Sequence, residues 1–327
     1  MRTIIYGAGA IGGTVGGHLA RAGFEVWLIG RPSHVNAIRD KGLRFVTPGG
    51  TYNLRLPAVT SPDLIDWQPG DVVLLCVKGQ DTEGAMRDLR AATNDVPVFC
   101  LQNGVRNEEI VSRFFPRVYG AMVRVGGVHL RPGEVIARRD PPGLLIIGRY
   151  PTGTDDLAEA LGQQLRAAGF LVRVTSDIMP YKYGKLLGNL ANAIGAITNA
   201  RGASDDDYAC IVEAARREAR ALFTRAGIRW VPSEALAQEG PGFDEPARAT
   251  VDAPAGSSTW QSLMRGQGSV ETAFLNGEIV RLAHHLGTEA PLNAALQRVA
   301  EEMAAKGEKP GKYSPAQLAA ILGLPEG

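Results

Sequence analysis

Three glycines near the start of the chain have the spacing of a phosphate-binding turn. The segment GAGAIG at positions 7–12 comes directly after the apolar run Thr3–Tyr6 and opens a helical pattern. In such a turn Gly7 permits the tight bend, Gly9 lets a pyrophosphate approach the backbone, and Gly12 allows a helix to pack closely on the sheet. The N–H groups at the helix N-terminus would bind the phosphates. The predicted dinucleotide-binding residues are Gly7, Gly9, Ala10, Ile11 and Gly12.

The residue that follows the second predicted strand bears on the type of dinucleotide. A site for NAD usually has an acidic residue about 20 positions after the glycines, where it binds the ribose 2′-hydroxyl. Here the strand Glu25–Ile29 is followed by Gly30 and Arg31. Because a guanidinium fits a 2′-phosphate, Arg31 favours NADP, although a solvated surface arginine is the alternative.

Two more polar residues follow predicted strands. Lys78 comes directly after the apolar run Asp71–Val77, and Asn103 follows Val96–Leu101. Ligands of open α/β sheets bind outside the carboxyl ends of the strands. We therefore expect Lys78 and Asn103 to lie at the same edge of the sheet as the glycine turn and Arg31.

Polar residues also recur in the second half of the chain, at helical spacing. Lys185, Asn189 and Asn192 are four and three positions apart, which predicts that they share one face of a helix. Their surroundings are apolar, so the choice between a solvent-facing stripe and a buried functional one stays open. Further on, Ser258 and Glu271 are candidate site residues, with a helix N-cap and a surface acid as their alternatives.

The elements that would position these residues change in type near the middle of the chain. Alternating apolar runs and helical patterns predict a doubly wound parallel sheet, an α/β domain of the Rossmann type, over residues 1–175. Residues 176–327 predict an all-helical domain with a long loop over 229–256. The expected strands are Thr3–Tyr6, Glu25–Ile29, Asp71–Val77, Val96–Leu101, Val118–Val125, Leu144–Ile147 and Leu171–Val174. The expected helices of the second domain are Met179–Ala200, Tyr208–Ala226, Ser257–Leu286, Pro291–Ala305 and a short one from about Ser314.

Composition excludes several classes of protein. The 327 residues include 35 basic and 34 acidic ones, a net charge of +1, so no electrostatic signal for nucleic acid or an anionic membrane is present. We expect no metal site, because the five histidines form no ligand-spaced motif. The three cysteines indicate a reducing compartment. Without a signal peptide or an apolar run of membrane-spanning length, the expected location is the cytoplasm.

In their order and spacing, these motifs resemble those of the ketopantoate reductase (2-dehydropantoate 2-reductase) family, over almost the whole chain. The resemblance rests on GAGAIG, Val77-Lys78, LQNG at 101–104, KLLxN at 185–189, and Ser258…Glu271…Asn276-Gly277. It implies an N-terminal Rossmann domain, a helical C-terminal domain, and NADPH-dependent reduction of a 2-oxo acid in the cleft between them. For 2-dehydropantoate the product would be pantoate, a precursor of coenzyme A.

The resemblance also implies a role for each matching residue. Lys185 matches the catalytic lysine and Glu271 the acid that supports it. Asn103 matches a residue at the nicotinamide end of the site, while Asn189 and Ser258 match substrate-binding groups. Arg31 and Lys78 match cofactor contacts. Lys182 lies one turn before Lys185 and is not at the family position, so we expect it to take no part in the reaction.

The chain departs from the family pattern only in its substrate half. The family has an asparagine where this chain has Ala193, and commonly an aspartate where it has Ser262. One residue is inserted before Glu271, and the 229–256 loop is long. One alternative is therefore a related NADP-dependent reductase of another 2-oxo acid, a hydroxy acid or an imine. The other is an NADPH-sensing regulatory protein without catalysis. The expected partner is a small 2-oxo acid, and the expected state a monomer or homodimer.

Overall fold

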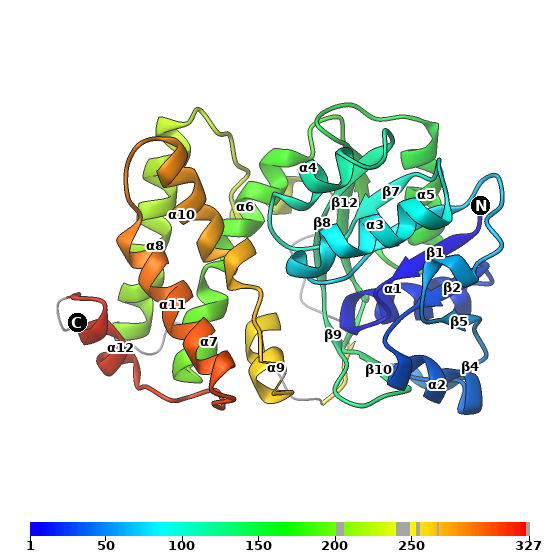
Figure 1. The fold of residues 1–327 in the computed structure, drawn as a ribbon, viewed down its shortest axis with the longest axis horizontal. Coiled ribbons are helices and arrows are strands. Elements are labelled where there is room, and N and C mark those ends of the chain that lie inside the picture. Colours follow the sequence, from blue (N-terminus) through cyan, green and yellow to red (C-terminus); the bar gives the residue numbers. More distant parts are fainter. Residues whose placement is uncertain (201–205, 240–248, 253–255, 267, 325–327) are drawn as a thin grey trace. The chain divides into compact units, whose positions relative to one another are not determined.

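An eight-stranded sheet forms the centre of the first half of the chain in the computed structural model (Figure 1). The structure describes all residues except 201–205, 240–248, 253–255, 267 and 325–327. In spatial order the strands are β13 (Leu171–Val174), β12 (Gly143–Arg149), β8 (Val118–Val125), β7 (Val98–Cys100), β6 (Val72–Leu75), β1 (Thr3–Tyr6), β2 (Val26–Ile29) and β5 (Ala58–Val59).

The strand order confirms the predicted fold class. From β8 to β5 the six neighbouring strands are all parallel, and β1 lies where the order of the chain reverses, as in a doubly wound fold. One feature differs from the expected parallel sheet: β12 runs antiparallel to β8. The link between these two strands holds short strands and no helix, so it does not make the crossover that a parallel pair requires.

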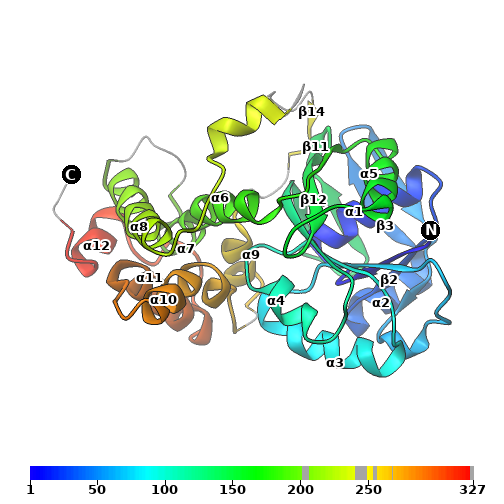
Figure 2. The same cartoon turned by 90° about the horizontal axis from the view of Figure 1, so that it is seen from above.

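Helices cover both faces of this sheet. Helices α1 (Ala10–Arg21), α2 (Pro32–Lys41) and α5 (Asp156–Ala167) contribute to the hydrophobic cluster on one face, together with Ile5 and Leu28. Helices α3 (Thr82–Ala92) and α4 (Asn107–Ser112) pack on the other face, against Ile4 and Val73 (Figure 2). Neighbouring strand residues point to opposite faces, and so the continuous apolar runs of the sequence are buried on both sides.

A second, four-stranded sheet was missed by the sequence analysis. Its order is β4 (Gly50–Leu54), β3 (Leu43–Thr47), β10 (Glu134–Ala137) and β9 (Gly127–Val128). Phe45 on β3 is fully buried, and its ring fills the space that a side chain at Gly17 of α1 would need. A two-stranded ribbon joins β11 (Arg139–Asp140) to β14 (Ala249–Thr250).

The chain divides into two units. Unit 1 comprises Met1–Gln102, Arg106–Lys182 and Glu234–Pro254, and unit 2 comprises Asn103–Val105, Tyr183–Ser233 and Ala255–Gly327. The sequence predicted one boundary at 175/176. In the structure the main boundary between the units lies at 182/183. The turn Asn103–Val105 belongs to unit 2 because it packs with the helices. The segment Glu234–Pro254 belongs to unit 1 because its strand β14 pairs with β11.

Helices are the only regular elements in the described part of unit 2. The helices are α6 (Met179–Asn189), which begins in unit 1, α7 (Ala191–Thr198), α8 (Asp206–Arg225), α9 (Ser258–Met264), α10 (Asn276–His285), α11 (Pro291–Ala305) and α12 (Pro315–Ile321). Their core contains Ile194, Ile197, Trp260, Leu296 and Met303. The predicted bounds of α11 are confirmed.

Two predicted helices are divided in the structure. The helix expected over 179–200 breaks at Leu190 into α6 and α7, and the one expected over 257–286 divides into α9, the short 3₁₀ turn η4 (Thr272–Phe274) and α10. The side-chain amide of Asn276 donates to the carbonyl of Leu190 at 3.4 Å. The carbonyl at the break thus accepts a hydrogen bond from a residue 86 positions further along the chain. Helical periodicity within the segment could not predict such a partner.

Candidate active site

The glycine turn after β1 leaves room for a phosphate. Gly7 has a φ of +107°, and a side chain there would collide with the backbone of Cys76 and Val77. At Gly12 a side chain would collide with the carbonyl of Gly7. Nothing lies within 4 Å of the position that a Cβ of Gly9 would occupy. Gly9 is the N-cap of α1, so this open space lies at the N-terminus of a helix and fits the pyrophosphate of a dinucleotide.

The two predicted cofactor contacts outside this turn stand at helix starts. Arg31 is the exposed N-cap of α2, and Lys78 is the half-buried N-cap of the 3₁₀ turn η2 (Gly79–Asp81). Arg31 follows β2 and Lys78 follows β6, so both come after carboxyl ends of strands that flank β1. This is the edge of the sheet at which the glycine turn lies, as the sequence analysis expected.

A buried histidine lies beside this edge. The Gly133 N–H donates to Nδ1 of His34 at 2.9 Å, so the neutral ring carries its proton on Nε2. The ring of His129 stands 4.3 Å from that of His34, centre to centre. Burial and the nearby His129 lower the pKa of His34 to about 4. Burial likewise lowers the pKa of His18, inside α1, to about 4.

In unit 2 the structure joins two of the predicted site residues. The side-chain amide of Asn189 donates to Oδ1 of Asn103 at 3.1 Å. Asn189 is the last residue of α6 and is 6% exposed, while Asn103 belongs to the turn after β7. The bond spans 86 positions of sequence and leaves Asn189 a second amide N–H.

Lys185 and Glu271 occupy different segments of unit 2. Lys185 is half-buried in α6, one turn before Asn189, and therefore lies on the same side of that helix. Glu271 is the N-cap of η4 and is 6% exposed, so the alternative interpretation as a surface acid is wrong.

The hydroxyl of Ser258 is buried in an unusual way. Its Oγ is inaccessible to water and has no hydrogen-bond partner among the described residues. The N-cap of α9 is Ser257, whose Oγ accepts from the N–H of Trp260 at 3.2 Å, so Ser258 is not the cap. A buried polar group without a partner is costly and calls for an explanation, such as a ligand that completes it.

The structure also gives the places of three further residues of the substrate half, of which Asn192 differs from the expectation. Asn192 belongs to α7, so the single helix face expected for Lys185, Asn189 and Asn192 is interrupted by the break at Leu190. Ala193 is fully buried within the hydrophobic cluster of unit 2. Ser262 is buried too, and its Oγ donates to the carbonyl of Ser258 at 2.8 Å.

Sequence reasoning missed a buried ion pair near the site residues. Lys182 pairs with Glu108, and their side chains are 2% and 0% exposed. Burial raises the pKa of Glu108, and the ammonium of Lys182 opposes that rise. A lysine within an otherwise apolar helix start was the available signal, but its acidic partner lies 74 positions earlier.

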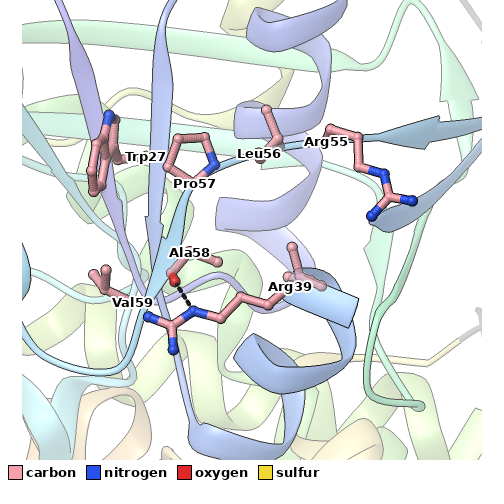
Figure 3. A pocket seen from close by; sticks show the side chains of 8 residues that line it. Trp27, Arg39, Arg55, Leu56, Pro57, Ala58 and Val59 are labelled. Carbon is pink, nitrogen blue, oxygen red and sulfur yellow. Dashed lines mark hydrogen bonds between the residues drawn. The ribbon is translucent and has the colours of Figure 1, made fainter. Parts of the chain in front are cut away.

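A cavity elsewhere in unit 1 contains none of the predicted residues. It has a volume of about 440 Å³ and lies at the β5 edge of the sheet (Figure 3). Arg39 crosses it and donates from Nε to the carbonyl of Ala58 at 2.7 Å. In the described ranges no three histidine, cysteine or acidic side chains gather where they could hold a metal ion. None of the helices described is long and apolar enough to span a membrane.

Fold and site together define a dinucleotide-dependent oxidoreductase, with a Rossmann-type unit and a helical unit that carries a lysine, an acid and two amides. Comparison with protein families gives the same class of protein and identifies one family within it. The family model "Ketopantoate reductase PanE/ApbA" matches residues 3–152, and its C-terminal counterpart matches residues 177–304. The chain belongs to the ketopantoate reductase family, which confirms the resemblance seen in the sequence. Ketopantoate reductases are NADP-dependent oxidoreductases.

Individual relatives match over nearly their whole length. The chain is 33% identical to the 2-dehydropantoate 2-reductase of Pyrococcus horikoshii, over 90% of this chain and 95% of that one. A crystal structure of a ketopantoate reductase of this family from Ralstonia eutropha is 31% identical and has a TM-score of 0.76, covering 94% and 99% of the two chains. D-mandelate dehydrogenase, solved with NADH and anilino(oxo)acetate, shares the fold at a TM-score of 0.80 and 24% identity, with the same coverage.

Proposed function

We propose that this protein reduces 2-dehydropantoate to pantoate with NADPH, and so supplies a precursor of coenzyme A. The observation that carries the proposal is the hydrogen bond from Asn189 to Asn103. It unites LQNG and KLLxN, two of the motifs that carry the resemblance. The relatives named 2-dehydropantoate 2-reductase support the choice of substrate.

The proposed proton donor is Lys185. NADPH, when bound, supplies a hydride to the ketone carbon of the substrate. Negative charge then develops on the carbonyl oxygen, and an ammonium within hydrogen-bond reach stabilises this charge and donates a proton to it. Glu271, a buried acid, would hold the lysine and accept a hydrogen bond from the new hydroxyl group.

The proposed substrate contacts come from neutral groups. Ser258 offers a buried hydroxyl that no described residue satisfies, and Asn189 offers its second amide N–H. Both can donate to a carboxylate without adding charge to the site. Asn103, bonded to Asn189, would stand at the nicotinamide end.

The proposed cofactor contacts are the backbone of the glycine turn together with Arg31 and Lys78. The open space over Gly9 at the start of α1 suits the pyrophosphate, and the exposed guanidinium of Arg31 suits the 2′-phosphate. A single charge-assisted fork of this kind is sufficient to distinguish NADPH from NADH.

The experiment that tests the proposal measures NADPH oxidation by the purified protein with a panel of 2-oxo acids. The panel contains 2-dehydropantoate, pyruvate, 2-oxoisovalerate and phenylglyoxylate, each with NADPH and with NADH. The expected result is the highest kcat/KM with 2-dehydropantoate and NADPH. Absence of turnover with every acid, combined with tight NADPH binding, would favour the regulatory alternative.

A related reductase of another 2-oxo acid is the second candidate, and Ala193 and Ser262 are the observations that favour it. Ala193 lies in the apolar core, and the hydroxyl of Ser262 is engaged with the carbonyl of Ser258. Neither offers the polar group that the family usually has. A lost hydrogen bond to a buried polar group costs about 1–3 kcal/mol, which predicts an elevated KM for 2-dehydropantoate. Phenylglyoxylate is in the panel because D-mandelate dehydrogenase shares this fold.

A further inference from the structure

A buried polar network lies at the carboxyl ends of β6 and β7, within unit 1. Lys182 pairs with Glu108 and donates from Nζ to the backbone carbonyl of Gln102 at 3.3 Å. The side-chain amide of Gln102 donates to the carbonyl of Val77 at 3.0 Å and to Oγ1 of Thr82 at 2.7 Å. The hydroxyl of Thr82 donates in turn to Asn107 at 2.9 Å.

Three members of this network are close in sequence to a residue of the proposed site. Val77 precedes Lys78, Gln102 precedes Asn103, and Lys182 comes one turn before Lys185 on α6. With a rise of about 1.5 Å per residue, the nitrogen atoms of the Lys182 and Lys185 backbone are only about 4.5 Å apart along the helix axis. A change in the Gln102 peptide therefore reaches Asn103 through one peptide bond, and a change in the first turn of α6 reaches Lys185 through one turn of helix.

The ammonium of Lys182 is not needed to satisfy the N-terminus of α6. Lys182 belongs to the first turn of α6, and its backbone N–H already donates to the carbonyl of Ile178. Its ammonium instead goes to a carboxylate and to one carbonyl in the turn after β7. Replacing a buried ion pair by apolar residues of similar size is often neutral or stabilising, so packing alone does not explain its presence.

We propose that Lys182 is a positioning residue, which uses Glu108 as its counterion and holds the Gln102–Asn103 peptide against the start of α6. This inference rests on the proposed function, since Asn103 and Lys185 are the groups that are positioned. It departs from the expectation that Lys182 takes no part in the reaction. Lys182 acts through its neighbours and not by touching the substrate.

The test replaces the whole pair, because a single substitution would leave an unpaired buried charge. The variant is Lys182→Met with Glu108→Leu. The matched control is Arg2→Met with Asp71→Leu. Arg2 and Asp71 form another buried pair in unit 1, 7% and 3% exposed, but they directly precede β1 and β6, at the opposite ends of the strands.

Three quantities are measured on each folded variant: kcat and KM with the best acid of the panel, NADPH affinity, and amide hydrogen exchange in peptides covering 101–106. In the Lys182 variant we expect kcat to fall tenfold to a hundredfold, as for a small misplacement of reacting groups, with NADPH affinity within about twofold. We also expect at least tenfold faster exchange in 101–106. The control variant should keep kcat and this exchange rate, whatever its melting temperature.

The outcomes separate the two proposals. Unchanged kcat and exchange in the Lys182 variant, or equal losses in both variants, would show that the pair is only structural. If the wild-type protein reduces no acid of the panel, the proposed function fails. The exchange comparison then still decides whether Lys182 holds the Asn103 turn.

Discussion

Removing the buried hydroxyl of Ser258 should make the protein more stable and its binding of substrate weaker. The Oγ atom has no described hydrogen-bond partner, and an unsatisfied buried group of this kind costs about 1–3 kcal/mol in the folded protein. Ser258→Ala should therefore raise the free energy of unfolding, by about 1 kcal/mol if part of the cost is recovered. The same change removes a proposed donor to the substrate carboxylate. Hydrogen bonds to charged groups contribute about 1.5–3 kcal/mol, so kcat/KM should fall about tenfold to 150-fold.

The adjacent residue supplies the control for this prediction. Thr259 is fully buried, and its Oγ1 also lacks a partner within the described ranges, but it is not among the proposed site residues. Thr259→Val should give a similar gain in stability without a change in kcat/KM. Urea unfolding and steady-state NADPH oxidation measure the two effects. A loss of stability in Ser258→Ala, or an unchanged kcat/KM, would refute the reasoning.

Three other predictions concern the cofactor, the proton donor and acid sensitivity. Arg31→Asp should reduce the preference for NADPH over NADH by about tenfold to a hundredfold, measured as the ratio of dissociation constants; equal affinities in the wild type would contradict the assignment. Lys185→Ala should lower kcat about a hundredfold to ten-thousandfold with little change in NADPH affinity. Adding Glu271→Ala to that variant should lower kcat much less than Glu271→Ala does in the wild-type protein. His18 and His34 have a pKa of about 4 in the folded protein against 6.5 ordinarily, so the unfolded chain takes up their protons first as the pH falls. The contribution of each neutral histidine to the free energy of unfolding is complete above about pH 6.5 and is lost as the pH falls toward 4. It amounts to at most about 3 kcal/mol for each histidine. Urea unfolding at several pH values would measure it.

The first half of the fold was predictable because its signals are local. A buried parallel strand such as β6 is a continuous apolar run, and the glycine turn is a short motif with one geometry. The strand β3 was missed although Leu43, Phe45 and Thr47 alternate with more exposed residues. One partner, β4, follows directly in a hairpin, but the other, β10, is 90 residues away, so the sheet that these strands complete could not be recognised locally.

The candidate site shows the same limit more sharply. The residue types at Lys185, Asn189 and Glu271 were available from the sequence, together with the family that they resemble. Long-range partners were not: the break at Leu190 is capped by Asn276, and Lys182 pairs with Glu108. Such pairs depend on which segments the fold brings together. No spacing rule within one helix contains that information.

The interleaving of the two units bears on how new substrate preferences can arise in such a chain. Unit 2 includes Asn103–Val105, which lies within the sequence of unit 1, and residues 234–254 return to unit 1 after a stretch of helices. A crossover that exchanged only the C-terminal half between two relatives would therefore bring in a foreign Asn189 without its own Asn103 turn. Chimaeras that move 103–105 together with 183–233 and 255–327 keep each hydrogen-bonded pair from one parent. A recombinant that inherits the LQNG turn and the helices from different parents must therefore form the Asn189–Asn103 pair between segments that did not arise together.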